Sequence, residues 1–136
     1  MIITVDGQGG KIGKMVVEQL KQKLPSLPIL AIGTNSIATA TMLKAGADAG
    51  ATGENPVLVN AKKADIIVGP LGIIIADALL GEITPRMAQA ICQSEAQKIL
   101  LPVNKCQTTI VGLKEITLSE VVALAVAEVE QTIKKS

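Results

Sequence analysis

Short apolar runs alternate along the chain with longer stretches in which apolar residues return every three or four positions. A short apolar run bounded by Gly, Pro, Asn or Asp is typical of a β-strand. Asp48–Gly53 fits least well, because Gly and Ala are weak strand formers. Six segments predict strands: Met1–Val5, Pro28–Ile32, Asp48–Gly53, Asp65–Val68, Lys98–Val103 and Thr108–Leu113.

The stretches between these runs predict helices, because their apolar residues fall on one face at helical spacing. The first helix follows a group of glycines and ends near Leu24, before Pro25. Ser36 is expected to cap the second helix, and Asn55-Pro56 to open the third. The other helices are expected at Leu71–Leu80, from Thr84-Pro85 to Ser94, and from the capping box Thr117-Leu118-Ser119-Glu120 to Lys134.

The alternation predicts one α/β domain over residues 1–136. We expect a doubly wound, mostly parallel sheet of five or six strands with helices on both faces, a Rossmann-like fold in the order 3-2-1-4-5-6. If Asp48–Gly53 is a loop, a five-stranded flavodoxin-like sheet is the alternative. Either fold places a ligand outside the carboxyl ends of the strands, beside the point where the strand order reverses.

A glycine-rich turn lies between the first strand and the first helix, which is the context of a phosphate-binding loop. Its candidate binding residues are Gly7, Gln8, Gly9, Gly10, Lys11, Ile12 and Gly13. The glycine pattern departs from both common fingerprints. A G-x-G-x-x-G motif that begins at Gly7 has Ile12 at the position of its third glycine, and a Walker loop that ends with Lys14 is followed by Met15 instead of Ser or Thr. The turn therefore predicts either a diphosphate-bearing ligand or only tight packing of the helix on the sheet.

Two further loops are expected at the same edge of the sheet. Gly33-Thr34-Asn35 follows the second strand, where NAD-binding proteins carry an acidic residue, and it offers neither a carboxylate nor an Arg for a 2′-phosphate. NAD(P) or another nucleotide stays possible as a cofactor, with Thr34 and Asn35 bonding to ribose or phosphate, or only forming the turn. Gly69, Pro70 and Gly72 follow the fourth strand and Asn104 the fifth, and they complete the candidate site.

Composition excludes several kinds of chemistry. The chain has no His and no aromatic residue, so it offers neither an imidazole base or metal ligand nor a stacking platform for nucleic-acid bases. A net charge of +1 without a basic stripe argues against nucleic-acid or membrane-surface partners. Cys92 and Cys106 are too few and too far apart to indicate a metal site, and they predict buried thiols in a reducing cytoplasm. Together with the absence of a basic leader after Met1, these features predict a cytoplasmic protein.

The segment Leu71–Leu80 is apolar almost all round, and a helix of that kind is either fully buried or part of an interface. We therefore expect a homodimer. Three carboxylates, Glu54, Asp77 and Glu82, lie in or near apolar segments, but no spacing pairs them, so no general acid or base is assigned.

Several runs resemble an uncharacterised family of short bacterial, mostly anaerobe-associated proteins that is classed as a domain of unknown function. The resemblance covers nearly the whole chain. It implies no activity, but it does imply that the glycine turn and the Gly-Thr-Asn and Gly-Glu-Asn segments belong to one common design. The runs that carry it are residues 6–13, 33–40, 50–55, 60–70 and 81–85.

Three functional hypotheses follow. The first is a protein that binds a nucleotide or another phosphate-bearing small molecule at the glycine turn. The second is a small-metabolite enzyme whose site is completed by a second subunit. The third is a regulatory or structural partner protein that binds no ligand.

Overall fold

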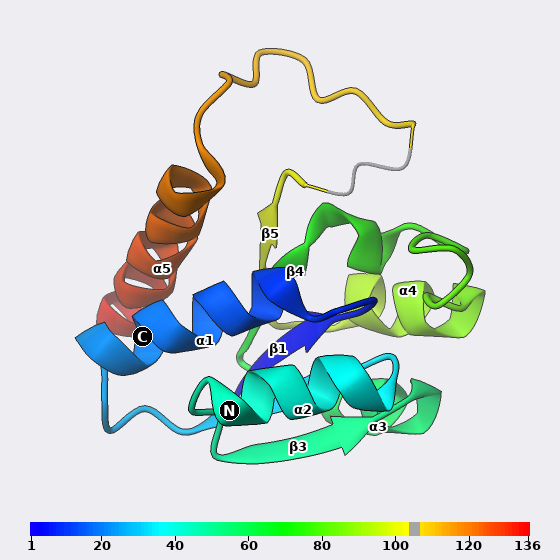
Figure 1. The fold of residues 1–136 in the computed structure, drawn as a ribbon, viewed down its shortest axis with the longest axis horizontal. Coiled ribbons are helices and arrows are strands. Elements are labelled where there is room, and N and C mark those ends of the chain that lie inside the picture. The colour runs from blue at the N-terminus through cyan, green and yellow to red at the C-terminus, as the bar shows by residue number, and fades with distance from the viewer. Residues whose placement is uncertain (104–106) are drawn as a thin grey trace.

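A computed structural model describes residues 1–103 and 107–136. Its centre is a parallel sheet in which β1 is flanked on one side by β2 and β3 and on the other by β4 and β5, in the order β3-β2-β1-β4-β5 (Figure 1). The chain therefore starts in the middle of the sheet and reverses direction beside β1, as a doubly wound Rossmann-like fold requires. The strands are β1 (Ile2–Asp6), β2 (Ile29–Gly33), β3 (Ala49–Thr52), β4 (Ile66–Pro70) and β5 (Gln97–Leu101).

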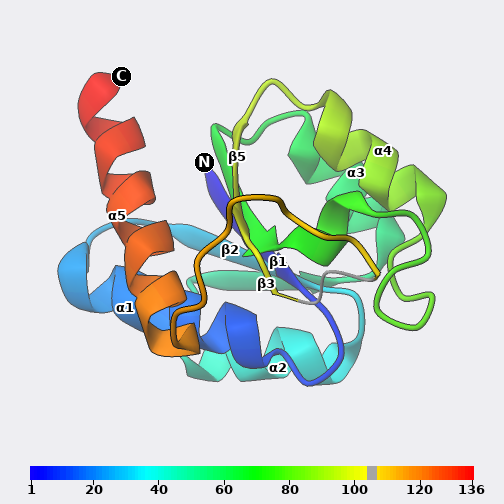
Figure 2. The same ribbon diagram turned by 90° about the horizontal axis from the view of Figure 1, so that it is seen from above.

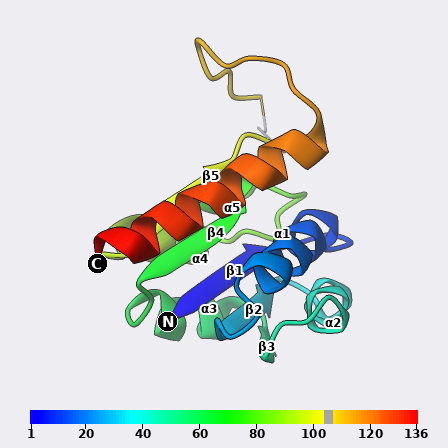
Figure 3. The same cartoon turned by 90° about the vertical axis from the view of Figure 1, so that its left-hand side faces the viewer.

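Helices cover both faces of the sheet (Figures 2 and 3). On one face, α1, α2 and α5 bury residues such as Val16, Met42 and Val126. On the other face, α3, α4 and the short 3-10 helix η1 bury Val57, Met87 and Ile73. The helices are α1 (Lys11–Lys23), α2 (Ser36–Lys44), α3 (Glu54–Ala61), η1 (Leu71–Ile74), α4 (Pro85–Gln93) and α5 (Leu118–Lys135).

Because both faces are covered, successive residues of β1 are all buried, Ile2 against one layer and Ile3 against the other. A strand buried on both faces reads as a continuous apolar run, which is why β1, β2 and β4 were predictable. Among the described residues, no helix has the length and apolar character needed to cross a membrane.

Most helix starts agree with the sequence signals. Thr84 caps α4 by accepting a hydrogen bond from the Met87 amide, and Thr117 forms the predicted capping box at the start of α5. Two caps were wrong by one or two residues. Asn35, not Ser36, caps α2, and α3 begins at Glu54 after Gly53, before the predicted Asn55-Pro56 start.

The predicted sixth strand at Thr108–Leu113 is wrong. None of these residues belongs to a strand, and the segment leading into α5 stands away from the sheet (Figures 1 and 3). The sheet of the described residues therefore has five strands, in the order 3-2-1-4-5, and lacks the predicted sixth. Because β2 pairs with β3, the flavodoxin-like alternative is wrong as well. A strand requires a hydrogen-bonded neighbour, and a run of β-prone residues does not itself supply one.

The predicted helix at Leu71–Leu80 is also wrong. Only η1 forms, and the chain then folds back on itself through two hydrogen bonds, from the Asp77 amide to the Ile83 carbonyl and from the Ile83 amide to the Ala78 carbonyl. Leu79 and Leu80 have positive φ angles of 57° and 56°, which a right-handed helix does not allow. The prediction of a homodimer rested on this apolar helix and loses that support. It stays a prediction.

Candidate functional site

The glycine-rich turn connects the carboxyl end of β1 to the start of α1. It is closed by a hydrogen bond of 2.9 Å from the Gly10 amide to the Gly7 carbonyl. Gln8 and Gly10 both have positive φ, 49° and 76°, and Gly10 is the N-cap of α1. Since glycine has no side chain to cap the helix, another group has to accept hydrogen bonds from the first amides of α1.

Asp6 is that group. Its carboxylate is 2% exposed and accepts hydrogen bonds from the amides of Gly13, at 2.7 Å, and of Gly7, at 2.8 Å. Burial raises the pKa of Asp6 above its ordinary value, the amides of Gly13, Gly7 and Ile12 pull the pKa down, and the charge of Glu82 adds to the rise. The inner side of the turn is therefore already occupied by a carboxylate side chain of the chain itself, and a ligand has only the outer side available.

Packing explains three of the four glycines of the turn. A Cβ on Gly7 would lie 2.7 Å from Thr34 Oγ1, and one on Gly13 would lie 2.3 Å from Met42 Sδ. Gly10 combines positive φ with a Cβ position 2.9 Å from the Ala38 Cα. Gly9 differs, because a Cβ there would meet nothing within 4 Å and its φ is not positive. Nothing in the described structure requires glycine at position 9, and the turn is bare at that point.

The turn encloses a small cavity. Its volume is about 180 Å³, and residues Asp6–Ile12 line it. The amides of Gly9 and Lys11 donate no hydrogen bond to any described residue. Lys11 is exposed and has no ion pair within the described part of the chain, whereas the Ile12 side chain points into the core and offers only its backbone.

The loop after β2 packs against the turn. Gly33 must be glycine, since a Cβ would lie 2.4 Å from the Thr39 amide nitrogen. Asn35 accepts a hydrogen bond from the Ala38 amide through Oδ1 and donates through Nδ2 to the Gln8 carbonyl at 2.9 Å. The cap of α2 and the glycine turn are thereby held by one side chain.

Glu82 joins these two loops from a distant part of the sequence. Its Oε1 accepts hydrogen bonds from the Gln8 amide at 2.9 Å, from Thr34 Oγ1 at 2.5 Å and from Asn35 Nδ2 at 2.8 Å. Desolvation raises the pKa of Glu82, but the hydrogen bonds from Thr34, Gln8 and Asn35 outweigh it, so the pKa lies below its ordinary value. An ionised carboxylate thus lies between the ends of β1 and β2.

The sequence singled out Glu82 but assigned it no partner. A carboxylate from residues 77–83 reaches the turn only because that segment folds back over the sheet edge instead of continuing as a helix. No pattern near Glu82 signals this contact, which joins residues 74 positions apart.

The other predicted residues lie elsewhere. Gly69 and Pro70 belong to β4 and are buried, as is Gly72 in η1, so they do not line an open loop. A Cβ on Gly69 would lie 2.4 Å from the Val5 carbonyl oxygen, which accounts for that glycine by packing. Asn104 lies outside the described residues, as does Cys106, whereas Cys92 is exposed, so the prediction that Cys92 is buried was wrong.

The two remaining carboxylates are not part of this site. Glu54 accepts a hydrogen bond of 2.5 Å from Thr84 Oγ1 and pairs with Arg86 at 3.6 Å. Asp77 is exposed, with a positive φ of 67°. Neither carboxylate therefore forms a hydrogen bond with the glycine turn in the described structure.

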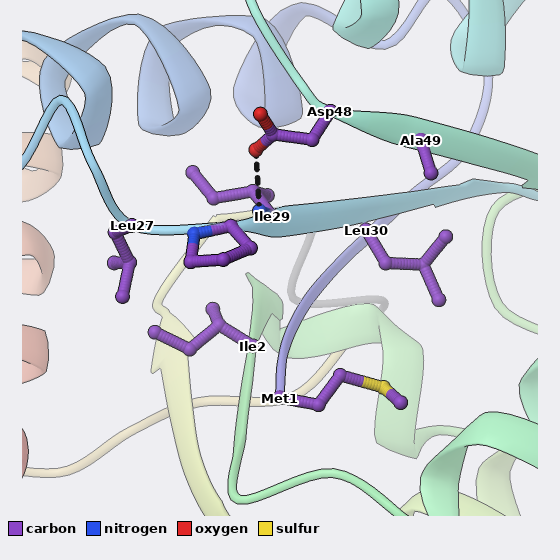
Figure 4. A pocket seen from close by; sticks show the side chains of 8 residues that line it. Met1, Ile2, Leu27, Ile29, Leu30, Asp48 and Ala49 are labelled. Carbon is purple, nitrogen blue, oxygen red and sulfur yellow. Dashed lines mark hydrogen bonds between the residues drawn. The ribbon is translucent and has the colours of Figure 1, made fainter.

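A larger cavity lies at the opposite edge of the sheet, beside the amino ends of β1, β2 and β3 (Figure 4). Its volume is about 300 Å³, and apolar side chains such as Ile2, Leu27 and Leu30 dominate its lining. The one carboxylate there, Asp48, accepts hydrogen bonds from the Ile29 amide at 2.7 Å and from Lys21 Nζ at 2.6 Å.

Comparison with known proteins identifies the family without an activity. No curated protein and no solved structure matches the chain. One family model matches residues 1–134, so the chain belongs to the family described as Domain of unknown function (DUF3842).

Proposed function

We propose that the protein binds a nucleotide, or another phosphate-bearing small molecule, on the outer side of the glycine turn. The observation that carries this proposal is the exposed backbone at Gly9, which no side chain covers, beside a cavity where the amides of Gly9 and Lys11 donate to no described residue. Backbone amides at the start of a helix favour an anion, because the helix dipole places positive potential there.

The size of the cavity limits which part of a ligand it can hold. Sites that enclose a whole small molecule usually measure about 300–1,000 Å³. A cavity of about 180 Å³ is large enough for a phosphate group but not for a complete nucleotide. The remainder of the ligand would therefore lie along the carboxyl edge of the sheet, toward Thr34 and Asn35.

Charge favours the outer side as well. Asp6 already accepts hydrogen bonds from the inward-facing amides, whereas the exposed Lys11, which has no ion pair among the described residues, carries a positive charge at the outer ones. A phosphate on Gly9 and Lys11 would gain two backbone hydrogen bonds and a lysine charge, an arrangement of charge-assisted bonds.

A thermal-shift titration with ADP and with pyrophosphate tests the proposal. Saturating ligand should raise the midpoint of unfolding by several degrees, because a ligand at ~100 Kd contributes about 2.7 kcal/mol. Gly9→Val should abolish the shift by filling the bare stretch, and Lys11→Gln should weaken it. Lys62→Gln, at an exposed lysine after α3, is the matched control and should leave the shift unchanged.

Two outcomes would count against this function. If neither probe shifts the unfolding midpoint of the wild-type protein, the proposed function is wrong. If Gly9→Val shows the full shift, the ligand binds away from the turn. The variant itself should fold normally, since a Cβ at position 9 meets nothing within 4 Å.

A partner protein is the second candidate. Large apolar side chains are exposed in residues 107–116, and Val111 is 94% exposed. An exposed group of such residues is typical of an interaction surface. The absence of any shift in the titration above would favour this candidate, and the enzyme hypothesis stays a prediction.

A further inference from the structure

The carboxylate of Glu82 is asymmetrically engaged. All three of its hydrogen bonds end on Oε1, from the Gln8 amide, Thr34 Oγ1 and Asn35 Nδ2. Oε2 accepts no hydrogen bond and joins no ion pair among the described residues. One oxygen is therefore held in place, and the second is left with its full capacity to accept.

The position of this carboxylate has a known chemical use in doubly wound sheets. The ribose of a nucleotide bound at the first turn lies beside the end of the second strand, where an acidic residue accepts hydrogen bonds from the ribose hydroxyls. Here the loop after β2, Gly33-Thr34-Asn35, contains no acidic residue. Its Thr34 and Asn35 instead hold a carboxylate that arrives from residues 77–83.

We propose that Glu82 recognises the 2′- and 3′-hydroxyls of a ribose whose phosphate lies at Gly9 and Lys11. This inference rests on the proposed function and adds the class of ligand, a ribonucleotide without a 2′-phosphate. The hydroxyls donate to the free oxygen of Glu82, while Thr34 and Asn35 orient the carboxylate through the other one. A 2′-phosphate would place its charge against Glu82, and no Arg lies in residues 33–36 to compensate.

The same hydrogen bonds also allow an opposite role. Glu82 would then stand in for a ligand anion and would have to leave before a phosphate could bind. The two roles differ in the sign of the effect when its charge is removed. Loss of a ribose acceptor weakens nucleotide binding, whereas loss of a competing anion strengthens the binding of phosphate groups.

Isothermal titration calorimetry with ADP, 2′-deoxy-ADP, adenosine 2′,5′-bisphosphate and pyrophosphate tests the assignment. The wild-type protein should bind ADP about tenfold more tightly than 2′-deoxy-ADP, the ratio expected for one lost hydrogen bond to a charged group. It should bind adenosine 2′,5′-bisphosphate more weakly than adenosine 5′-monophosphate, which serves as its reference.

Glu82→Gln is the variant of choice, because a glutamine oxygen still accepts from Gln8, Thr34 and Asn35. We expect it to lower ADP affinity roughly tenfold, to reduce the preference for ADP over 2′-deoxy-ADP, and to leave pyrophosphate binding unchanged. Glu95→Gln, at an exposed carboxylate between α4 and β5, is the control and should behave as the wild type.

The outcomes separate the two proposals. Equal affinities of the wild-type protein for ADP and 2′-deoxy-ADP, with pyrophosphate still bound, would overturn the ribose assignment and keep the phosphate site. Tighter pyrophosphate binding by Glu82→Gln would overturn it in favour of a competing anion. If no probe binds the wild-type protein, the proposed function fails and the assignment fails with it.

Discussion

The two edges of the sheet use carboxylates in different ways. At the amino edge, Asp48 accepts a hydrogen bond from the Ile29 amide (Figure 4) and also forms an ion pair with Lys21 at 2.6 Å. At the carboxyl edge, Asp6 and Glu82 accept only from amides and a hydroxyl, and within the described residues neither has a cationic partner.

This difference indicates which edge is available to a ligand. The side-chain hydrogen bond from Lys21 is the main reason why the pKa of Asp48 lies below its ordinary value, so that charge is neutralised within the chain. The carboxylates of Asp6 and Glu82 accept hydrogen bonds from polar groups alone, and the charge of Glu82 raises the pKa of Asp6. Carboxylates that lack a cationic partner and have shifted pKa values, gathered at one edge of the sheet, indicate a functional site more strongly than does an apolar cavity.

The largest expected loss of stability comes from a substitution that introduces a steric clash at the carboxyl edge of the sheet. Gly33→Ala would place a Cβ 2.4 Å from the Thr39 amide nitrogen, and backbone there cannot move without shifting α2. We expect a loss of about 2–3 kcal/mol in the free energy of unfolding, measured by urea denaturation.

Gly9→Ala is the matched control for Gly33→Ala. It should change stability by less than about 0.5 kcal/mol, because a Cβ there has no neighbour within 4 Å. Similar losses in both variants would mean that the bare stretch of the turn is itself under packing constraint, and would remove the argument for a ligand at Gly9.

The second-largest expected effect is a difference in stability between variants of Asp6 and Asp48. Asp6→Asn should cost about 2 kcal/mol in urea denaturation, because one amide nitrogen of the new side chain would face a backbone N–H of Gly7 or Gly13 and leave it unsatisfied. Asp48→Asn, at an exposed ion pair, should cost clearly less than Asp6→Asn. A larger loss of stability for Asp48→Asn than for Asp6→Asn would show that the amino edge, not the carboxyl edge, depends more on its carboxylate.

The smallest effect concerns pH. The pKa of Glu82 is lowered on folding, so its ionised form contributes stability that is present above its ordinary value of 4.5 and lost as the pH falls through the folded value. The pKa of Asp6 is raised on folding, so its contribution has the opposite sign: it is present below 3.8 and lost as the pH rises.

Urea denaturation of the wild type and of Glu82→Gln between pH 6 and pH 3 measures this contribution. The stability advantage of the wild type should shrink as the pH falls, since the glutamine does not titrate. A constant difference across this range would show that the three hydrogen bonds on Glu82 do not favour its charged form.

The sequence alone predicted the parallel sheet, its five strands and the caps at Thr84 and Thr117. These features are local: an apolar run between breakers, or a Thr followed by the amide it caps, needs no knowledge of the remainder of the chain. The glycine turn was predictable for the same reason, because its signal lies within a few residues of the end of β1.

The tertiary structure decided what those local signals left open. The β-prone run Thr108–Leu113 pairs with no strand of the described residues. The apolar segment after β4 forms tight left-handed turns at Leu79 and Leu80 instead of a helix, and these turns bury Leu79 but leave Leu80 exposed. Neither outcome depends on the residues of the segment alone, because pairing and burial are properties of its neighbours.

The candidate site shows the same division. The sequence identified the glycines and singled out Glu82, but it did not predict the contacts of the two carboxylates that distinguish the site, Asp6 on the inner side of the turn and Glu82 between β1 and β2. A carboxylate acquires its partners, its charge state and its free oxygen from groups brought together by folding, and Glu82 meets Gln8 across 74 positions of the chain. Only the fold could place it there, because no short-range pattern encodes a contact over that separation.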